Sequence, residues 1–206
     1  MSSNPRGNAD KLRILALHGF RGSGAALRRQ MRAFSAGLAD EAEFVFVDAP
    51  TRADGGVGWW RALEESDPNG SPLKRYDGWD KSRDFVAECC RLERPFDGVF
   101  GFSQGATLAG LLVALQAPSF EFAILVGGFA SADAAHVPLY RPGVFQVPSL
   151  HLIGLADNVV PPERSRALAL SFHKPLILEH EGGHIVPAGG QVLSGTQAFL
   201  RQMRTR

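Results

Sequence analysis

The fold is decided by the stretch Gly98-Val99-Phe100-Gly101-Phe102-Ser103-Gln104-Gly105-Ala106-Thr107-Leu108-Ala109-Gly110-Leu111-Leu112. Its first part is apolar on successive positions, which is typical of a buried strand, and the apolar-rich part from Ala106 predicts a helix. Ser103 lies at the turn between them, in the pattern G-x-S-x-G and in the strand–turn–helix context that this motif requires. Gly101 and Gly105 lack side chains, so the two backbones can approach closely. The stretch predicts a sharp turn that presents the Ser103 hydroxyl at the end of a sheet.

A serine at such a turn is a candidate nucleophile. The helix that follows would direct backbone N–H groups and a partial positive charge toward the space where an oxyanion could form. A glycine-rich turn that carries a serine by chance would show the same pattern. The hypothesis therefore requires a base, an orienting acid and a second oxyanion donor elsewhere in the chain.

Length and composition restrict the class of protein. The chain has 206 residues, of which 45% are hydrophobic, and a net charge of +1. These values predict one globular domain and give no support for nucleic-acid binding. No apolar run approaches the roughly 20 residues that span a bilayer, so we expect no transmembrane segment. Residues 1–10 lack an apolar segment, and we expect them to form a disordered leader before a domain at residues 11–206.

The cysteine content favours a reducing compartment. Cys89 and Cys90 are adjacent on an expected helix, where neighbouring side chains diverge, so we expect two buried thiols and no disulfide. No spacing of potential ligands is typical of a metal site, and we expect no metal and no other cofactor. A cytoplasmic location fits this pattern. The sequence leaves the oligomeric state open, and a homo-oligomer is compatible with it.

Strand and helix patterns alternate along the chain. This order predicts an α/β fold with a mostly parallel central sheet and helices on both faces. The expected strands cover residues 14–17, 43–48, 99–102, 122–126, 149–153 and 176–180. The expected helices cover residues 25–38, 79–92, 162–172 and 191–204 and the segment that begins at Ala106.

Two segments interrupt this alternation. Residues 51–80 are rich in Gly, Pro and aromatic residues and show no clear period, which is typical of a functional loop or a small lid. Residues 131–147 form a second, Pro-containing excursion. They are the only material for a lid, so we expect short lid loops and no large cap domain.

The candidate partners of Ser103 follow two later strands. Parallel sheets bind ligands at the carboxyl ends of their strands, and Asp157 and His184 both lie just past such an end. The chain order Ser, Asp, His is the one expected for this chemistry on a parallel sheet. His184 would remove the Ser103 proton, while Asp157 would hold the required tautomer of the imidazole.

Other residues could fill the same roles. Asp133, which lies near His136 in the second excursion, is the best alternative acid, and His180 is the alternative base. We prefer Asp157 on chain order, and we prefer His184 because a base needs the freedom of a loop, whereas His180 lies within the last strand. His18 ends the first strand, and we expect it to bond to loop backbone as part of the scaffold.

The oxyanion donors and the acyl pocket complete the prediction. The residue after the nucleophile supplies one backbone N–H, here Gln104, and the loop after the first strand supplies another, for which we choose Phe20. At least one aromatic ring could line an acyl pocket together with Phe20. The candidates are Trp59, Trp60, Tyr76 and Phe129. The tryptophan pair could equally anchor the irregular loop to the core.

Four motifs occur in one chain and in a fixed order: Leu17-His18-Gly19-Phe20, Gly101-Phe102-Ser103-Gln104-Gly105, Gly154-x-x-Asp157-x-x-Val160-Pro161 and Gly182-Gly183-His184. With these motifs the sequence resembles the α/β-hydrolase superfamily from Lys11 to about Leu200. Within it, the chain most resembles the FSH-type serine hydrolases and is similar to the phospholipase/carboxylesterase group, which includes acyl-protein thioesterases. It resembles dienelactone hydrolases less, because their nucleophile is commonly Cys.

The resemblance implies a single-domain α/β-hydrolase that cleaves a small-molecule carboxylic ester without a metal. Ser103 would be the nucleophile, His184 the base and Asp157 the acid, and the reaction would pass through an acyl-enzyme. An acyl-thioesterase with the same three residues is the nearest alternative. A non-catalytic ligand-binding protein of this fold, or an interaction domain that uses the aromatic loop, belongs to a different class of function.

Overall fold

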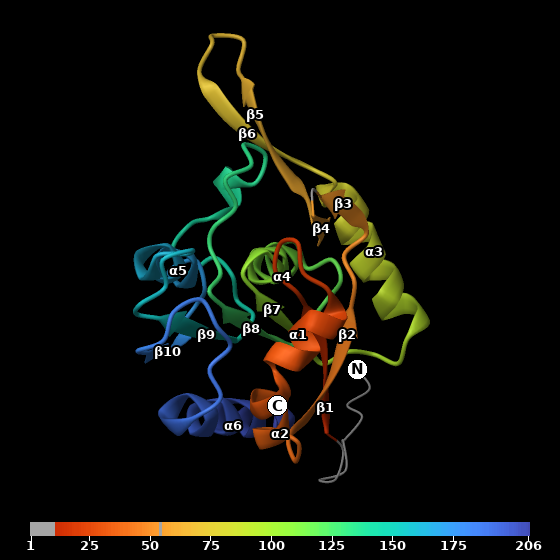
Figure 1. Cartoon of the computed structure of the whole chain (residues 1–206), viewed down its shortest axis with the longest axis vertical. Helices are drawn as coiled ribbons and strands as arrows, with labels where there is room; N and C mark the ends of the chain where they lie inside the picture. The colour runs from red at the N-terminus through yellow and green to blue at the C-terminus, as the bar shows by residue number, and fades with distance from the viewer. Residues whose placement is uncertain (1–10, 54) are drawn as a thin grey trace.

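A six-stranded parallel sheet forms the centre of the computed structural model, which describes residues 11–53 and 55–206 (Figure 1). Its strand order is β10-β9-β8-β7-β1-β2, and each pair of neighbours is parallel. The strands are β1 (Leu12–Leu17), β2 (Ala42–Val47), β7 (Gly98–Phe102), β8 (Phe122–Val126), β9 (Ser149–Gly154) and β10 (Leu176–His180). The expected α/β architecture is confirmed, and the carboxyl ends of all these strands meet at one edge. The leader expected at residues 1–10 lies outside the described residues.

Helices cover both faces of the sheet and bury a core on each. One face packs against α1 (Gly24–Gln30), α2 (Arg32–Gly37) and α6 (Gly190–Arg204). The other packs against α3 (Trp79–Leu92), α4 (Gln104–Leu115) and α5 (Pro162–Ala169). Strands β1, β7, β8 and β9 are buried along their whole length, which explains their continuous apolar runs.

Two helix predictions are wrong in detail. The single helix expected over residues 25–38 is divided into α1 and α2 at Met31, where ψ is 1° instead of a helical value. Leu27, Phe34 and Leu38 still face the core, so an apolar stripe did not distinguish one helix from two. Helix α5 ends at Ala169, whereas the pattern predicted its end at residue 172.

The segment expected to be irregular forms two antiparallel hairpins. The shorter consists of β3 (Thr51–Ala53) and β4 (Gly56–Gly58), and the longer of β5 (Arg61–Ser66) and β6 (Pro72–Asp77). The longer hairpin protrudes from the body of the molecule (Figure 1). Its second strand, β6, is attached to the second excursion, because the Ala134 N–H donates to the Lys74 carbonyl over 3.0 Å. That excursion contains a short 3₁₀ helix, η1 (Val137–Leu139).

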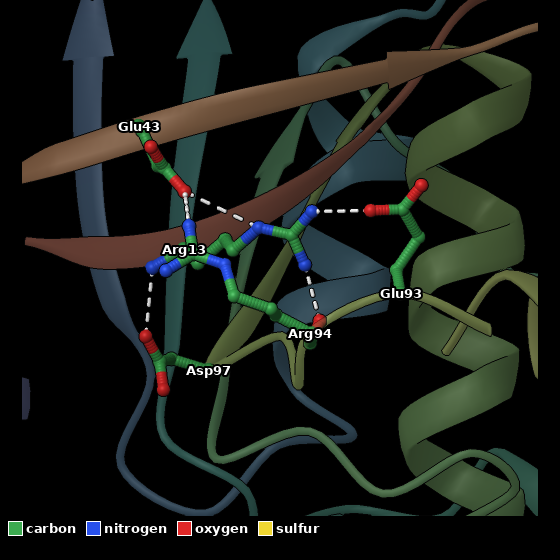
Figure 2. A network of polar contacts seen from close by, with 5 residues as sticks. All are labelled: Arg13, Glu43, Glu93, Arg94 and Asp97. Atoms are coloured by element: carbon green, nitrogen blue, oxygen red, sulfur yellow. Dashed lines mark hydrogen bonds and ion pairs between the residues drawn. The ribbon is translucent and has the colours of Figure 1, made fainter. Parts of the chain in front are cut away.

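A polar network at the amino edge of the sheet surrounds Arg13 (Figure 2). The guanidinium contacts Glu93 at 2.7 Å and Glu43 at 3.2 Å, and it also donates to the Arg94 carbonyl. The main-chain N–H of Arg13 donates to the Asp97 carboxylate over 2.7 Å. The network joins β1 and β2 to the connection between α3 and β7. It lies at the end of the sheet opposite to the carboxyl edge and fixes the strands there.

The described residues contain two free thiols, Cys89 and Cys90, both half-buried in α3. Burial raises the pKa of Cys90 to about 11 and also raises the pKa of Cys89, so both stay protonated. Across residues 11–53 and 55–206, no group of three or more His, Cys, Asp or Glu side chains is arranged to hold a metal ion. None of the helices in this part of the chain is long and apolar enough to cross a membrane.

Candidate active site

Ser103 occupies a strained turn between β7 and α4. Its φ is 56° and its ψ is −119°, a conformation that a non-glycine residue adopts rarely. The turn is held because the Ser103 N–H donates to the Val126 carbonyl over 2.9 Å. A Cβ atom at Gly101 would overlap the Gly105 backbone, and one at Gly105 would overlap the Leu17 carbonyl. The crossing of strand and helix therefore requires glycine at both positions, as the motif predicted.

Asp157 and His184 are joined by a short hydrogen bond. The Asp157 Oδ2 atom lies 2.6 Å from the His184 Nδ1 atom. The other carboxylate oxygen accepts the N–H groups of Val159 and Val160 over 2.9 and 2.8 Å, and the Asp157 side chain is buried. A carboxylate held in this way fixes the imidazole, with Nδ1 as the protonated nitrogen and Nε2 as the acceptor.

The loops that carry these two residues are hydrogen-bonded to each other. The Leu155 N–H donates to the His180 carbonyl over 2.8 Å, and the Ala156 N–H donates to the Gly182 carbonyl over 3.2 Å. A Cβ atom at Gly154 would overlap the Gly183 carbonyl, so the two loops approach as closely as backbones allow. The pairing of Asp157 with His184 therefore depends on contacts of the main chain as well as on their own hydrogen bond.

Ser103 lies beside this pair. The ring centroids of Phe102 and His184 are 4.7 Å apart. A Cβ atom at Gly127 would lie 3.0 Å from His184 Cε1, and Gly127 directly follows Val126, the hydrogen-bond partner of Ser103. Within the described part of the chain the Ser103 hydroxyl makes no hydrogen bond to His184, so a proton transfer between them would require a side-chain or loop adjustment that closes this contact.

The loop after β1 lies on the other side of Ser103. A Cβ atom at Gly19 would lie 3.3 Å from the Ser103 Cβ. The Gly19 carbonyl accepts hydrogen bonds from His18 Nδ1 over 2.7 Å and from the Gly22 N–H over 3.1 Å. Because N–H and C=O point in opposite directions in a trans peptide, the Phe20 N–H faces away from these two donors. Among the described residues, neither the Phe20 N–H nor the Gln104 N–H is engaged in a hydrogen bond, so both are free to bind an anion.

His18 belongs to the scaffold, as expected. Its Nε2 accepts the Ala49 N–H over 3.0 Å, so Nδ1 is the nitrogen that carries the proton and donates to Gly19. Burial lowers the pKa of His18 and keeps it neutral. The side chain therefore joins the loop after β1 to the loop after β2, and both of its nitrogens are occupied.

The rivals considered from the sequence have other partners. Asp133 accepts the N–H groups of Tyr76 and Ala135 over 2.5 and 2.9 Å and so anchors the longer hairpin. His136 contacts the Ser131 hydroxyl at 3.0 Å. His180 accepts the Gly182 N–H at its Nδ1 over 3.2 Å, and burial lowers its pKa. The structure places the alternative acid beside the hairpin and leaves Asp157 as the carboxylate that contacts His184.

The aromatic residues proposed for the pocket are placed mostly in the core. Trp59 and Trp60 are 0% and 2% exposed, and Tyr76 stacks on Trp60 with ring centroids 4.5 Å apart. Phe129 is half-buried, and the Arg164 guanidinium lies 4.7 Å from the centre of its ring. Trp59, Trp60 and Tyr76 therefore anchor the hairpins to the core, which is one of the two alternatives that the sequence left open. A role in the acyl pocket stays a prediction.

Sequence reasoning missed the role of the Gln104 side chain. Its Oε1 accepts the Trp59 N–H and its Nε2 donates to the Trp60 carbonyl, both over 2.9 Å. The backbone of the tryptophan pair is thus hydrogen-bonded to the residue that follows Ser103. No local pattern reveals this contact, because the partners are far apart in the chain.

Comparisons with known proteins show the family to which the chain belongs. The model of the family described as serine hydrolase (FSH1) matches residues 8–194. Esterase OVCA2 of Danio rerio is 34% identical and covers 96% of this chain and 100% of its own length. Esterase OVCA2 of Xenopus tropicalis is 38% identical, with 86% of each chain covered.

Solved structures support the fold. The crystal structure of Zea mays acyl-protein thioesterase 2 matches with a TM-score of 0.69 and 20% identity, covering 98% of this chain and 97% of that one. Arabidopsis thaliana SOBER1 matches with a TM-score of 0.70 and 18% identity, covering 96% and 100%. The family match over most of the sequence and the relatives that cover nearly the whole chain lead to one conclusion: the chain belongs to the FSH1 family of serine hydrolases.

Proposed function

We propose that this serine hydrolase cleaves small-molecule carboxylic esters with a triad of Ser103, His184 and Asp157. The observation that carries the proposal is the 2.6 Å contact between Asp157 and His184 beside the strained Ser103 turn. Its relatives from Danio rerio and Xenopus tropicalis are named esterases, which supports the same class of substrate. No cofactor is part of the proposed reaction.

The first half of the reaction forms an acyl-enzyme. Neutral His184 accepts the Ser103 proton at Nε2 while the Ser103 oxygen attacks the ester carbonyl carbon. The resulting imidazolium is stabilised by Asp157, whose Oδ2 already contacts Nδ1. His184 then donates its proton to the departing alkoxide, the C–O bond of the ester breaks, and the acyl group stays on Ser103.

The second half releases the acid. Water takes the place of the alcohol, His184 removes its proton at Nε2, and the water oxygen attacks the acyl carbon. The bond between this carbon and the Ser103 oxygen then breaks as His184 returns the proton to the serine. In both halves the Phe20 and Gln104 N–H groups would stabilise the negatively charged oxygen of the tetrahedral intermediate. Removal of one such donor commonly lowers the rate by a factor of roughly 10²–10³.

An apolar acyl pocket is part of the proposal. Large exposed apolar side chains flank the proposed machinery: Phe20 on the oxyanion loop is 46% exposed, Val159 follows the acid, and Ile185 follows the base. Together with the half-buried Phe129, they offer apolar contacts to an acyl chain. The buried Trp59, Trp60 and Tyr76 would support this surface from beneath.

A thioesterase is the second candidate. The maize structure with the same fold is titled an acyl-protein thioesterase, and the same nucleophile and oxyanion donors would serve a thioester. Matched oxygen esters and thioesters of one acyl chain separate the two: the larger kcat/KM identifies the preferred leaving group.

The test is a kinetic series on p-nitrophenyl esters of increasing acyl length. Wild type should turn over at least part of the series. Ser103→Ala should keep its fold, measured by circular dichroism, and lose kcat by a factor of roughly 10³ or more, because the members of a triad act as a unit. Equal turnover by wild type and Ser103→Ala would contradict the proposal.

A further inference from the structure

Trp59 connects the two segments that carry the proposed oxyanion donors. Its main-chain N–H donates to the Gln104 side chain over 2.9 Å, and its indole N–H donates to the His18 carbonyl over 2.7 Å. Gln104 supplies one of the two amides, and His18 belongs to the loop that supplies the other through Phe20. One buried residue therefore bonds to both sides of the candidate oxyanion hole.

The remaining polar atom of Trp59 is also engaged. The Ser82 hydroxyl, on α3, donates to the Trp59 carbonyl. The Gln104 amide adds a second contact by donating to the Trp60 carbonyl over 2.9 Å. Buried N–H and C=O groups require hydrogen-bond partners, so the informative observation is which segments supply the partners of Trp59. Their effect is to fix Trp59 against α3, α4 and the end of β1 at the same time.

The shorter hairpin closes the same assembly. Val57 on β4 pairs with Gly22 in the oxyanion loop. A Cβ atom at Gly58 would lie 2.9 Å from the Phe20 ring and 3.0 Å from Gln104 Oε1. The residues just before Trp59 thus pack directly between Phe20 and Gln104, and the indole holds the carbonyl that precedes Gly19.

We propose that Trp59 is a positioning residue that sets the distance between the Phe20 and Gln104 amides. The inference rests on the proposed function of these amides and names a residue that acts on them through His18 and the Gln104 side chain. Such donors stabilise the transition state only when each lies about 2.7–3.1 Å from the oxyanion. A small displacement of the β1 loop would lower the rate of acylation and leave the binding of the ground-state ester unchanged.

The test compares Trp59→Phe with Trp79→Phe. The first variant removes the indole N–H and keeps an aromatic ring in the core. Trp79 is a matched control, because it is also buried and contacts Trp60 and His136, but its indole makes no hydrogen bond within the described residues. Both variants lose similar apolar area, so loss of packing alone affects them alike.

We measure kcat and KM on a p-nitrophenyl ester, the Ki of an alkyl boronic acid, and the Tm. A boronic acid forms a tetrahedral adduct with the serine and so reports on the oxyanion hole. Trp59→Phe should lower kcat by roughly 10- to 100-fold with KM little changed, and raise Ki by a similar factor. Trp79→Phe should change kcat and Ki less than threefold, whatever its effect on Tm.

A second variant covers the case in which Trp59→Phe does not fold. Gln104→Met removes both amide contacts to the tryptophan pair and keeps the backbone N–H, and it should show the same fall in kcat at unchanged KM. Wild-type kcat and Ki in a folded Trp59→Phe, or equal losses in both tryptophan variants, would overturn the inference and leave the proposed function intact. An inactive wild type would overturn both.

Discussion

At the scale of single residues, Asp157 determines which nitrogen of His184 carries the proton. The 2.6 Å contact requires a proton on Nδ1, because an ionised carboxylate only accepts. Without this contact the imidazole is free to adopt the other tautomer, in which Nε2 donates and cannot remove the Ser103 proton.

Asp157→Asn should therefore retain the fold and lose activity. The amide oxygen can still accept the N–H groups of Val159 and Val160, so the loop is preserved. We expect kcat to fall by roughly 10³- to 10⁴-fold. Steady-state kinetics at pH 7 and circular dichroism provide the measurement. Asp133→Asn changes a carboxylate that contacts the hairpin instead, and a comparable loss in that variant would argue against the assignment of the acid.

The residues of the site differ in how well the sequence predicts them. Asp157 follows the buried strand β9 and His184 follows β10, the parallel strand beside it, so topology alone was enough to suggest that they meet. The Trp59 contacts with Gln104 and His18 were not predictable, because they join segments distant in sequence through a side-chain amide and an indole. From composition alone, a buried tryptophan and one at a pocket wall look the same.

At the scale of elements, the close contact between the loop after β9 and the loop after β10 holds Asp157 and His184 together. Gly154→Ala places a methyl group against the Gly183 carbonyl and forces the loops apart. We expect kcat to fall by at least tenfold, with a loss of stability of about 1–3 kcal/mol. Kinetics and urea denaturation test this.

Gly110→Ala is the control for this substitution. Gly110 lies in α4, where an added Cβ would come no closer than 3.7 Å to Leu168. Alanine favours a helix over glycine by about 1 kcal/mol, so this variant should be equally or more stable and fully active. Full activity in Gly154→Ala would show that the two loops tolerate separation.

The elements themselves were predictable where burial decides them. The central strands read as apolar runs because both of their faces are covered. The strands of the longer hairpin contain no apolar run, so the sequence pattern did not predict them. They carry charges on both faces and are joined by ion pairs such as Arg75 with Glu65 at 2.6 Å. The break between α1 and α2 depends on the backbone conformation of Met31, which the apolar stripe of the two helices does not predict.

At the scale of the whole molecule, buried histidines make stability depend on pH. His151 is buried in β9, and burial lowers its pKa to about 3. Burial also lowers the pKa values of His18 and His136. A group whose pKa is lower in the folded protein binds its proton more readily after unfolding. The free energy of unfolding therefore decreases as the pH falls below about 6.5.

His151→Gln should weaken this dependence. The wild type should lose stability between pH 8 and pH 5, and His151 can contribute a slope of up to about 1.4 kcal/mol per pH unit below pH 6.5. The variant should have a lower free energy of unfolding than wild type at pH 8. Its free energy of unfolding should fall less than that of wild type between pH 8 and pH 5. Urea titrations at pH 8 and pH 5 give the free energies of unfolding that test this. An equal fall in wild type and variant between the two pH values would contradict it.

The central claim is that Ser103 is activated by His184, and labelling with a fluorophosphonate probe tests it most directly. The probe reacts with an activated serine, and peptide mass spectrometry identifies the modified residue. We expect wild type to be labelled at Ser103, His180→Ala to retain labelling and His184→Ala to lose it. Labelling that survives His184→Ala but is abolished by His180→Ala, or that occurs at another serine, would contradict the account.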